Sequence, residues 1–182
     1  LDTYERVVSR GPLYPLNSLM LHGIIYARYD KELNTDPGND FANEVHSYFG
    51  TGTQLQEMYI TPSLLSTKNW DTLAEAAKWS RENASVLRDT HWVGGDPMWL
   101  NVYGWASWSP KKSILVLRNP SGKPQSIAID LGKVLELPAG AAQVYSGKSP
   151  WKAENSKPSI DLDAKTPHVF DLAPFEVLTL DL

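Results

Sequence analysis

Six side chains along the chain have the chemistry and the placement to contact a bound ligand. Polar residues at the carboxyl ends of parallel strands line the mouth of a β/α barrel, where its ligands bind. Two apolar segments of strand type, 19–26 and 54–60, carry polar residues on the strand or its approach, and a tryptophan follows near a Gly-Gly pair. The candidate substrate-binding residues are Tyr14, Asn17, His22, Gln54, Glu57 and Trp92.

Each candidate also has a purely structural interpretation. His22 is explained equally well as a hydrogen-bonded histidine within the packing of a sheet, and Glu57 as half of a structural ion pair. Trp92 lies in the stretch 90–97, whose glycines favour a tight interdomain connection with a buried tryptophan over the border of a binding cleft. No second carboxylate accompanies Glu57 in an obvious way, so no residue is assigned a catalytic role.

Several classes of function lack their signature in this sequence. There is no Walker loop and no GxGxxG, GxSxG or HExxH motif, and the four histidines lack ligand-like spacing. We therefore expect no cofactor and no metal. A net charge of −4 and a pI near 5.5 argue against a nucleic-acid partner. No apolar run approaches the roughly 20 residues of a bilayer-spanning helix, so no membrane partner is expected.

The first half of the chain has the hydrophobic pattern of α/β units, in which apolar runs are separated by amphipathic stretches of helical period. The apolar run 19–26 predicts a parallel strand buried on both faces, 39–49 predicts a helix that ends at Gly50, and 54–60 predicts a second strand. Ser66 or Thr67 can cap a longer helix, in which Trp79 falls on or near the wetter side. The stripe of this helix that we expect to be buried consists of Trp70, Leu73, Ala77, Ala84 and Leu87.

After residue 97 the pattern changes to short segments with a period of two, separated by turn residues. The change predicts a domain boundary: residues 1–97 form the C-terminal segment of a (β/α) barrel, and residues 98–182 form an antiparallel β-sandwich. The segments 113–118 and 125–131 predict a hairpin. The fold class is thus α+β and multidomain. Further strands are expected at 103–108, 142–145, 168–172 and 175–182, with a long loop over 146–158.

The order of these segments resembles the end of a known enzyme family. The residues that carry the resemblance are Tyr4-Glu5-Arg6, Pro12-Leu13-Tyr14-Pro15-Leu16-Asn17-Ser18, Leu21-His22-Gly23 and Tyr48-Phe49-Gly50, before a short strand, a long helix and a sandwich. In this order they resemble the C-terminal part of the melibiase-like α-galactosidases, glycoside hydrolase family thirty-six and its relatives. The stretch 105–110, followed by 115–120, is similar to the start of the sandwich in exported members of this group.

The resemblance implies a retaining glycoside hydrolase that acts on α-galactoside-like carbohydrate. Its aspartate nucleophile and aspartate acid/base would both precede residue 1, and Asp2 is not assigned either role. An N-terminal barrel portion, in cis or as a second chain, would be needed to cover the open sheet edges. A secreted or periplasmic location is expected for such a protein, and its lack of cysteine is compatible with bacterial export.

Two other functions fit the same sequence. A non-catalytic carbohydrate-binding or structural β-sandwich module would use exposed tryptophans as its platform, and an ordinary interaction domain would have no sugar specificity, because a fold alone does not determine function. The seven Trp and eight Tyr suit stacking on sugar rings as well as core packing. An upstream partner segment would favour the hydrolase, whereas an aromatic platform on an open face would favour the binding module.

Overall fold

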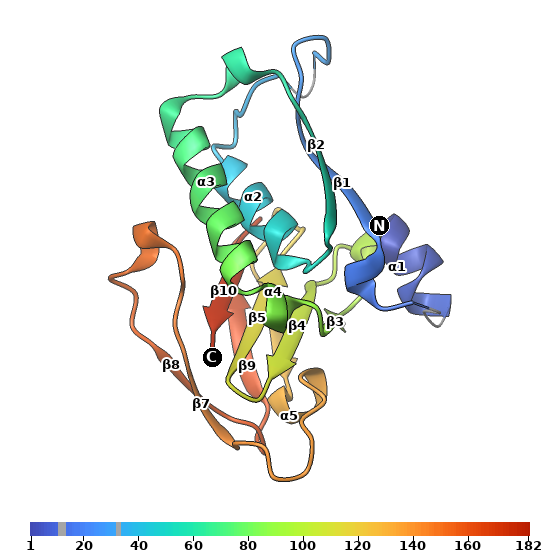
Figure 1. Cartoon of the computed structure of the whole chain (residues 1–182), viewed down its shortest axis with the longest axis vertical. Coiled ribbons are helices and arrows are strands. Elements are labelled where there is room, and N and C mark those ends of the chain that lie inside the picture. Colours follow the sequence, from blue (N-terminus) through green and yellow to red (C-terminus); the bar gives the residue numbers. More distant parts are fainter. Residues whose placement is uncertain (11–13, 32–33) are drawn as a thin grey trace.

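The first half of the chain forms a parallel βαβ unit flanked by helices (Figure 1). The computed structural model describes residues 1–10, 14–31 and 34–182. Strand β1 (Met20–Tyr26), helix α2 (Phe41–Gly50) and strand β2 (Leu55–Ile60) follow one another, and β1 pairs with β2 in parallel. The flanking elements are α1 (Asp2–Arg6), η1 (Val8–Arg10), η2 (Leu16–Ser18), η3 (Pro62–Leu64), α3 (Thr67–Glu82) and α4 (Ala84–Leu87).

The second half is built from antiparallel sheets. A four-stranded sheet has the order β10-β5-β4-β3, and two smaller sheets pair β6 with β9 and β7 with β8. The strands of the large sheet are β3 (Thr90–Gly94), β4 (Tyr103–Ser109), β5 (Lys112–Arg118) and β10 (Val177–Asp181). The smaller sheets contain β6 (Gln125–Ile129), β7 (Val144–Gly147), β8 (Ile160–Asp163) and β9 (His168–Leu172). Short helical turns are η4 (Pro97–Trp99), α5 (Leu131–Val134) and η5 (Lys152–Glu154).

The four-stranded sheet is the middle layer of the molecule and is buried on both faces. Along β5, Ile114 and Val116 belong to the core shared with α2 and α3, whereas Leu115 and Leu117 belong to the core shared with the smaller sheets. This division follows from the strand geometry, in which successive side chains point to opposite faces. The predicted antiparallel half and the predicted parallel pair are therefore both present, joined through this sheet.

Helix α3 begins as the sequence predicts, but it turns a different side toward the core. Ser66 caps it by accepting a hydrogen bond from the backbone N–H of Asn69. Trp79 is buried and its indole N–H donates to Asp181 of β10 at 3.1 Å, whereas Trp70 is exposed. The predicted positions of these two tryptophans were wrong because the end of α3, not its start, packs on the sheets. No helix in the described part of the chain is long and apolar enough to cross a bilayer.

The strands differ from the prediction at two places, one in burial and one in pairing. Segment 19–26 forms a parallel strand, but its burial on both faces was wrong, since Met20, His22 and Ile25 are exposed. Segments 113–118 and 125–131 form no hairpin, because β5 pairs with β4 and β10 while β6 pairs with β9. The buried Asn119 side chain donates to the carbonyls of Lys123 and Ala173, and so fixes the turn that carries the chain from one sheet to another.

The stretch predicted as an interdomain connection is partly a strand. Residues 90–94 form β3, in which Trp92 lies opposite Trp105 of β4. The change in hydrophobic pattern at residue 97 therefore falls between β3 and β4, which are paired strands of one sheet. The division into domains at 97/98 stays a prediction.

Candidate functional site

The parallel pair carries a polar cluster of side chains from both strands. His22 and Glu57 are partners in the parallel register, and His22 Nδ1 lies 3.1 Å from Glu57 Oε2. Tyr59, two residues after Glu57 and on the same face, has its hydroxyl 3.0 Å from the same nitrogen of His22. Two of the six predicted residues are thus in contact, together with a tyrosine that the sequence analysis did not select.

Desolvation and the charge of Glu57 keep two tyrosines protonated, Tyr59 of the cluster and Tyr48 of α2. Desolvation and the negative charge of Glu57 raise the pKa of Tyr59, and burial, with a smaller contribution from Glu57, raises the pKa of Tyr48 to about 12. Both phenols therefore stay protonated near neutral pH, and Tyr59 can donate its proton to the Glu57 carboxylate. Tyr48 donates to the carbonyl of Leu21, which ties β1 to α2.

Three predicted residues lie at the other end of the strands from the one expected. Tyr14 and Asn17 precede β1, and Gln54 precedes β2. The backbone N–H of Gln54 donates to the carbonyl of Asn17 at 2.9 Å, so these two residues meet at the amino ends. Their expected location at a barrel mouth was wrong, because they precede the strands instead of following them. A role in substrate binding stays a prediction for all three.

Residues at the carboxyl ends of the strands were missed. Arg28, which follows β1, donates from its guanidinium to Ser63 Oγ at 2.8 Å and from its backbone N–H to Thr61 Oγ1 at 3.1 Å. Thr61 and Ser63 follow β2 in the same way. The signal was present in the sequence, since a cation and two hydroxyls come directly after the two apolar runs.

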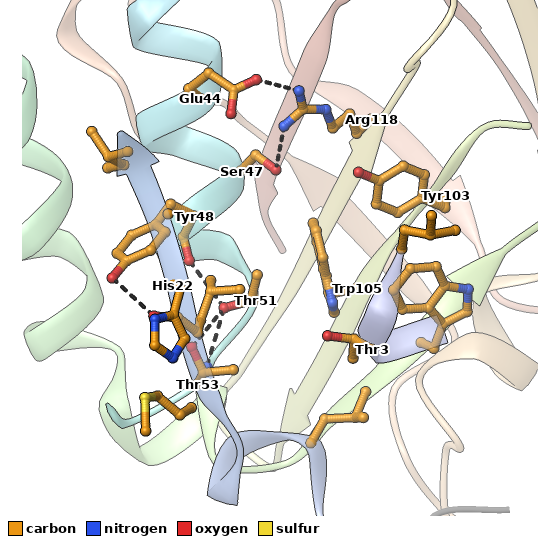
Figure 2. A pocket seen from close by; sticks show the side chains of 17 residues that line it. Thr3, His22, Glu44, Ser47, Tyr48, Thr51, Thr53, Tyr103, Trp105 and Arg118 are labelled. Carbon is orange, nitrogen blue, oxygen red and sulfur yellow. Dashed lines mark hydrogen bonds and ion pairs between the residues drawn. The ribbon is translucent and has the colours of Figure 1, made fainter. Parts of the chain in front are cut away.

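A cavity of about 330 Å³ lies between β1, α2 and the four-stranded sheet (Figure 2). One wall is aromatic: Trp92 stacks on Tyr103 at 5.0 Å and contacts Trp105 edge to face at 5.8 Å. The α2 side and the turn after it contribute Ser47, Thr51 and Thr53. His22 and Trp92 both border this cavity, so it brings together one more pair of the predicted residues.

An ion pair crosses one end of the cavity. Figure 2 shows Arg118 of β5 directed toward Glu44 and Ser47 of α2, and the guanidinium donates to the Glu44 carboxylate and, at 3.1 Å, to Ser47 Oγ. Burial opposes the charge on Arg118, but the neighbouring Glu44 carboxylate outweighs it and raises the pKa of the guanidinium. The pair therefore fixes α2 to the sheet in its charged form.

The cavity also contains a polar atom without a partner. Among the residues that the structure describes, the buried indole N–H of Trp92 has no hydrogen-bond acceptor. In the same part of the chain, no group of three or more His, Cys, Asp or Glu side chains could hold a metal ion.

Comparison with known proteins gives a likeness of fold. No protein-family model matches the chain, and no curated protein matches it. A GH27 β-L-arabinopyranosidase from Geobacillus stearothermophilus superposes with a TM-score of 0.53 over 77% of this chain, at 12% identity. An α-amylase from Geobacillus thermoleovorans, solved with acarbose, gives 0.53 over 89% at 12% identity, and α-galactosidase I from Mortierella vinacea gives 0.54 over 85% at 8% identity.

These three solved structures are glycoside hydrolases, and this chain spans only part of each. It covers 29%, 38% and 38% of their respective chains. The identities are too low for the likeness to extend beyond the fold. The chain therefore shares its architecture with one part of several glycoside hydrolases. The names of these enzymes refer to different sugars.

Proposed function

We propose that the chain is the C-terminal part of a retaining glycoside hydrolase that acts on α-galactoside-like carbohydrate, in a secreted or periplasmic protein. The observation that supports this proposal is a parallel βαβ unit joined to an antiparallel sheet, in the arrangement found in part of several glycoside hydrolases. In this proposal β1 and β2 are the last strands of a (β/α) barrel.

The free side of β1 supports the presence of a preceding barrel portion, in cis or as a second chain. Within the described ranges β1 pairs with β2 alone, and the exposed apolar residues Met20, Ile25 and Leu55 lie on the pair. A strand added at this edge would be joined to β1 by a right-handed crossover, which puts the connecting helix on the α2 side of the sheet. The N-terminal residues Leu1 and Thr3 lie on that side, where they line the cavity of Figure 2.

The cluster of His22, Glu57 and Tyr59 would then face the interior of the completed barrel. Glu57 holds the Nδ1 side of the His22 ring, so that Nε2 is available to bind a sugar hydroxyl, as a carboxylate orients an imidazole in other sites. Glycoside hydrolysis needs two carboxylates across one bond. In this proposal both come from the preceding strands, and His22 and Arg28 bind and orient the substrate.

Hydrolysis of a panel of nitrophenyl glycosides tests the proposal. The isolated chain and the longest product of its reading frame would be compared on α-galactoside, α-glucoside and β-L-arabinopyranoside. We expect turnover by the longer product only, fastest on the α-galactoside, and a loss of tenfold or more in kcat/KM for His22→Gln. Lys78→Gln, on the exposed face of α3, is the matched control. Turnover by the isolated chain would contradict the proposal, because it would place a complete catalytic pair within residues 1–182.

A non-catalytic carbohydrate-binding module is the second candidate function. The observation that favours it is an exposed apolar turn, in which the Trp99 ring is 76% exposed between Met98 and Leu100. Such a ring can stack on a sugar without any catalysis. Sugar binding that is lost in Trp99→Ala, with no turnover by either product, would favour this candidate over the hydrolase.

A further inference from the structure

A second hollow, of about 550 Å³, lies where the approach to β1 meets the start of β3. We call it the amino-end groove. The side chains on which its chemistry depends are Tyr14, Arg88, Asp89, His91, Trp92 and Glu136. It contains Tyr14 and Trp92, two of the residues that the sequence selected for substrate binding, but in a place that the barrel-mouth rule does not describe.

A histidine held between two carboxylates forms the polar part of the groove. His91 Nε2 lies 3.4 Å from Asp89 Oδ1, and His91 Nδ1 lies 3.2 Å from Glu136 Oε1. Both carboxylates are more than half exposed, so each retains lone pairs that face solvent. Glu136 adopts a φ of +49°, a conformation that is unfavourable for a residue other than glycine and that is concentrated at functional sites.

An aromatic ring lies open at the same groove. The Tyr14 side chain is 68% exposed, whereas Trp92 is fixed by contacts with Tyr4, Tyr103 and Trp105. An exposed ring beside a rigid one can cover the apolar face of a bound molecule. The groove therefore offers an apolar surface and a set of hydrogen-bonding groups side by side.

We propose that the amino-end groove binds a neutral oligosaccharide. The charges of its walls have both signs: an anionic ligand is opposed by Asp89 and Glu136, and a cationic ligand by the Arg88 guanidinium. A sugar hydroxyl both donates and accepts, so it can satisfy the carboxylates and the guanidinium without a net charge. The volume lies within the range of known small-molecule sites. The choice of a sugar rests on the proposed carbohydrate-active function, but binding at this groove requires no catalysis.

Affinity electrophoresis and NMR titration of the isolated chain test this inference. The probes are neutral galacto-oligosaccharides and malto-oligosaccharides, against anionic oligogalacturonate and cationic chitosan oligomers. We expect saturable binding of at least one neutral series and weaker binding of both charged ones. Tyr14→Ala should weaken binding by roughly tenfold, since it removes one stacking contact, and Glu136→Gln by roughly fivefold, since it removes a charge-assisted acceptor.

Controls separate a local effect from misfolding and from the other exposed rings. Tyr29→Ala removes a ring that is 94% exposed and lies outside the groove, so binding should be unchanged. Each variant should keep the unfolding midpoint of the parent chain. Absence of saturable binding to any neutral probe overturns the inference. A loss that follows Trp99→Ala but not Tyr14→Ala also overturns it, and would move binding to the turn at 97–99.

The outcomes of this test and of the proposed function are separable. Turnover by the longer product, with no binding by the isolated chain, would support the proposed hydrolase and contradict sugar binding at the amino-end groove. Binding that depends on Tyr14 and Glu136, with no turnover by either product, keeps the groove and removes the hydrolase.

Discussion

The parallel pair β1–β2 and the four-stranded sheet are made from similarly apolar strands but have opposite surroundings. In β5, residues 114–117 are all buried, because helices cover one face and the smaller sheets the other. In β1 only Ile24 is buried, and Figure 1 shows α2 and α3 on one side of the β1–β2 ribbon. A strand of this chain is therefore buried on both faces only where the chain itself supplies a covering layer on each face.

The largest expected effect is a cavity in the middle layer. Leu115→Ala should lower the free energy of unfolding by about 3 kcal/mol, because the side chain is fully buried. Met20→Ala, on the parallel pair, should change it by less than about 1 kcal/mol in the isolated chain. Urea unfolding measures both values.

The same two substitutions, Leu115→Ala and Met20→Ala, can also be measured in the longest product of the reading frame. If a preceding barrel portion covers β1, the cost of Met20→Ala should rise toward that of a buried residue. An unchanged, small cost in the longer product would break the comparison, since it would mean that this face of β1 stays uncovered.

The contact between the helices and the loop 148–158 should be sensitive to acid. Trp151, 1% exposed, stacks on His46 of α2 at 3.9 Å and packs against Trp79 of α3. Burial lowers the pKa of His46 to about 4, although the Glu154 carboxylate partly opposes the shift. A partly buried, neutral imidazole therefore forms part of the link between the two regions.

The pH dependence follows from the two pKa values of His46. The unfolded chain, with an ordinary pKa of 6.5, binds the proton more strongly than the folded one, so stability falls as the pH decreases from 6.5 to about 4. The loss at pH 4 amounts to about 3 kcal/mol. His46→Phe should be less sensitive over this window, as measured by denaturant unfolding at pH 7 and pH 4.5. Equal acid sensitivity in both proteins would show that His46 is accessible to solvent.

A close approach of β1 to α2 gives a smaller effect. A Cβ atom at Gly23 would lie 2.7 Å from Cδ2 of Tyr48. Gly23→Ala should lower the free energy of unfolding by about 2 kcal/mol, because the ring must move from its packed position. Gly38→Ala is the control, since the nearest atom lies 3.5 Å away. A neutral Gly23→Ala would mean that β1 can move away from α2 at no cost in the isolated chain.

The ion pair between α2 and the sheet should give the smallest effect. Glu44→Gln leaves the half-buried Arg118 guanidinium without its carboxylate, and should cost about 1 kcal/mol. Glu82→Gln breaks an exposed pair with Lys78 and should cost less than about 0.5 kcal/mol. Thermal unfolding at two salt concentrations separates the two pairs, and equal losses in both variants would contradict a role for burial.

Local signals in the sequence were sufficient for most of the elements. Gly50 at the end of α2, the Ser66 cap of α3 and the period of two in the second half are properties of adjacent residues, and these elements lie close to their predicted positions. Strand partners were not predictable in the same way. The hairpin at 113–131 was wrong because β5 pairs with β10 as well as β4, and β6 pairs with β9, so that both segments find partners from later parts of the chain.

The candidate site was predicted in part for a related reason. His22 and Glu57 lie on adjacent parallel strands, as the βαβ unit predicts, but the register that pairs them was not predictable from the sequence. Tyr14, Asn17 and Gln54 lie at the amino ends because they come before the apolar runs in the sequence, so the order of residues was enough to exclude them from the carboxyl ends. Arg28 and Ser63 occupy the end that the barrel rule describes.

The sequence by itself determined the kinds of element, their order and the change from parallel to antiparallel structure, because propensity, capping and periodicity act between residues close in the chain. Tertiary structure alone decided which faces are buried and which side chains meet. Trp79 is buried and Trp70 exposed, and β5 is covered while β1 is open, because burial depends on neighbours that come from distant parts of the chain.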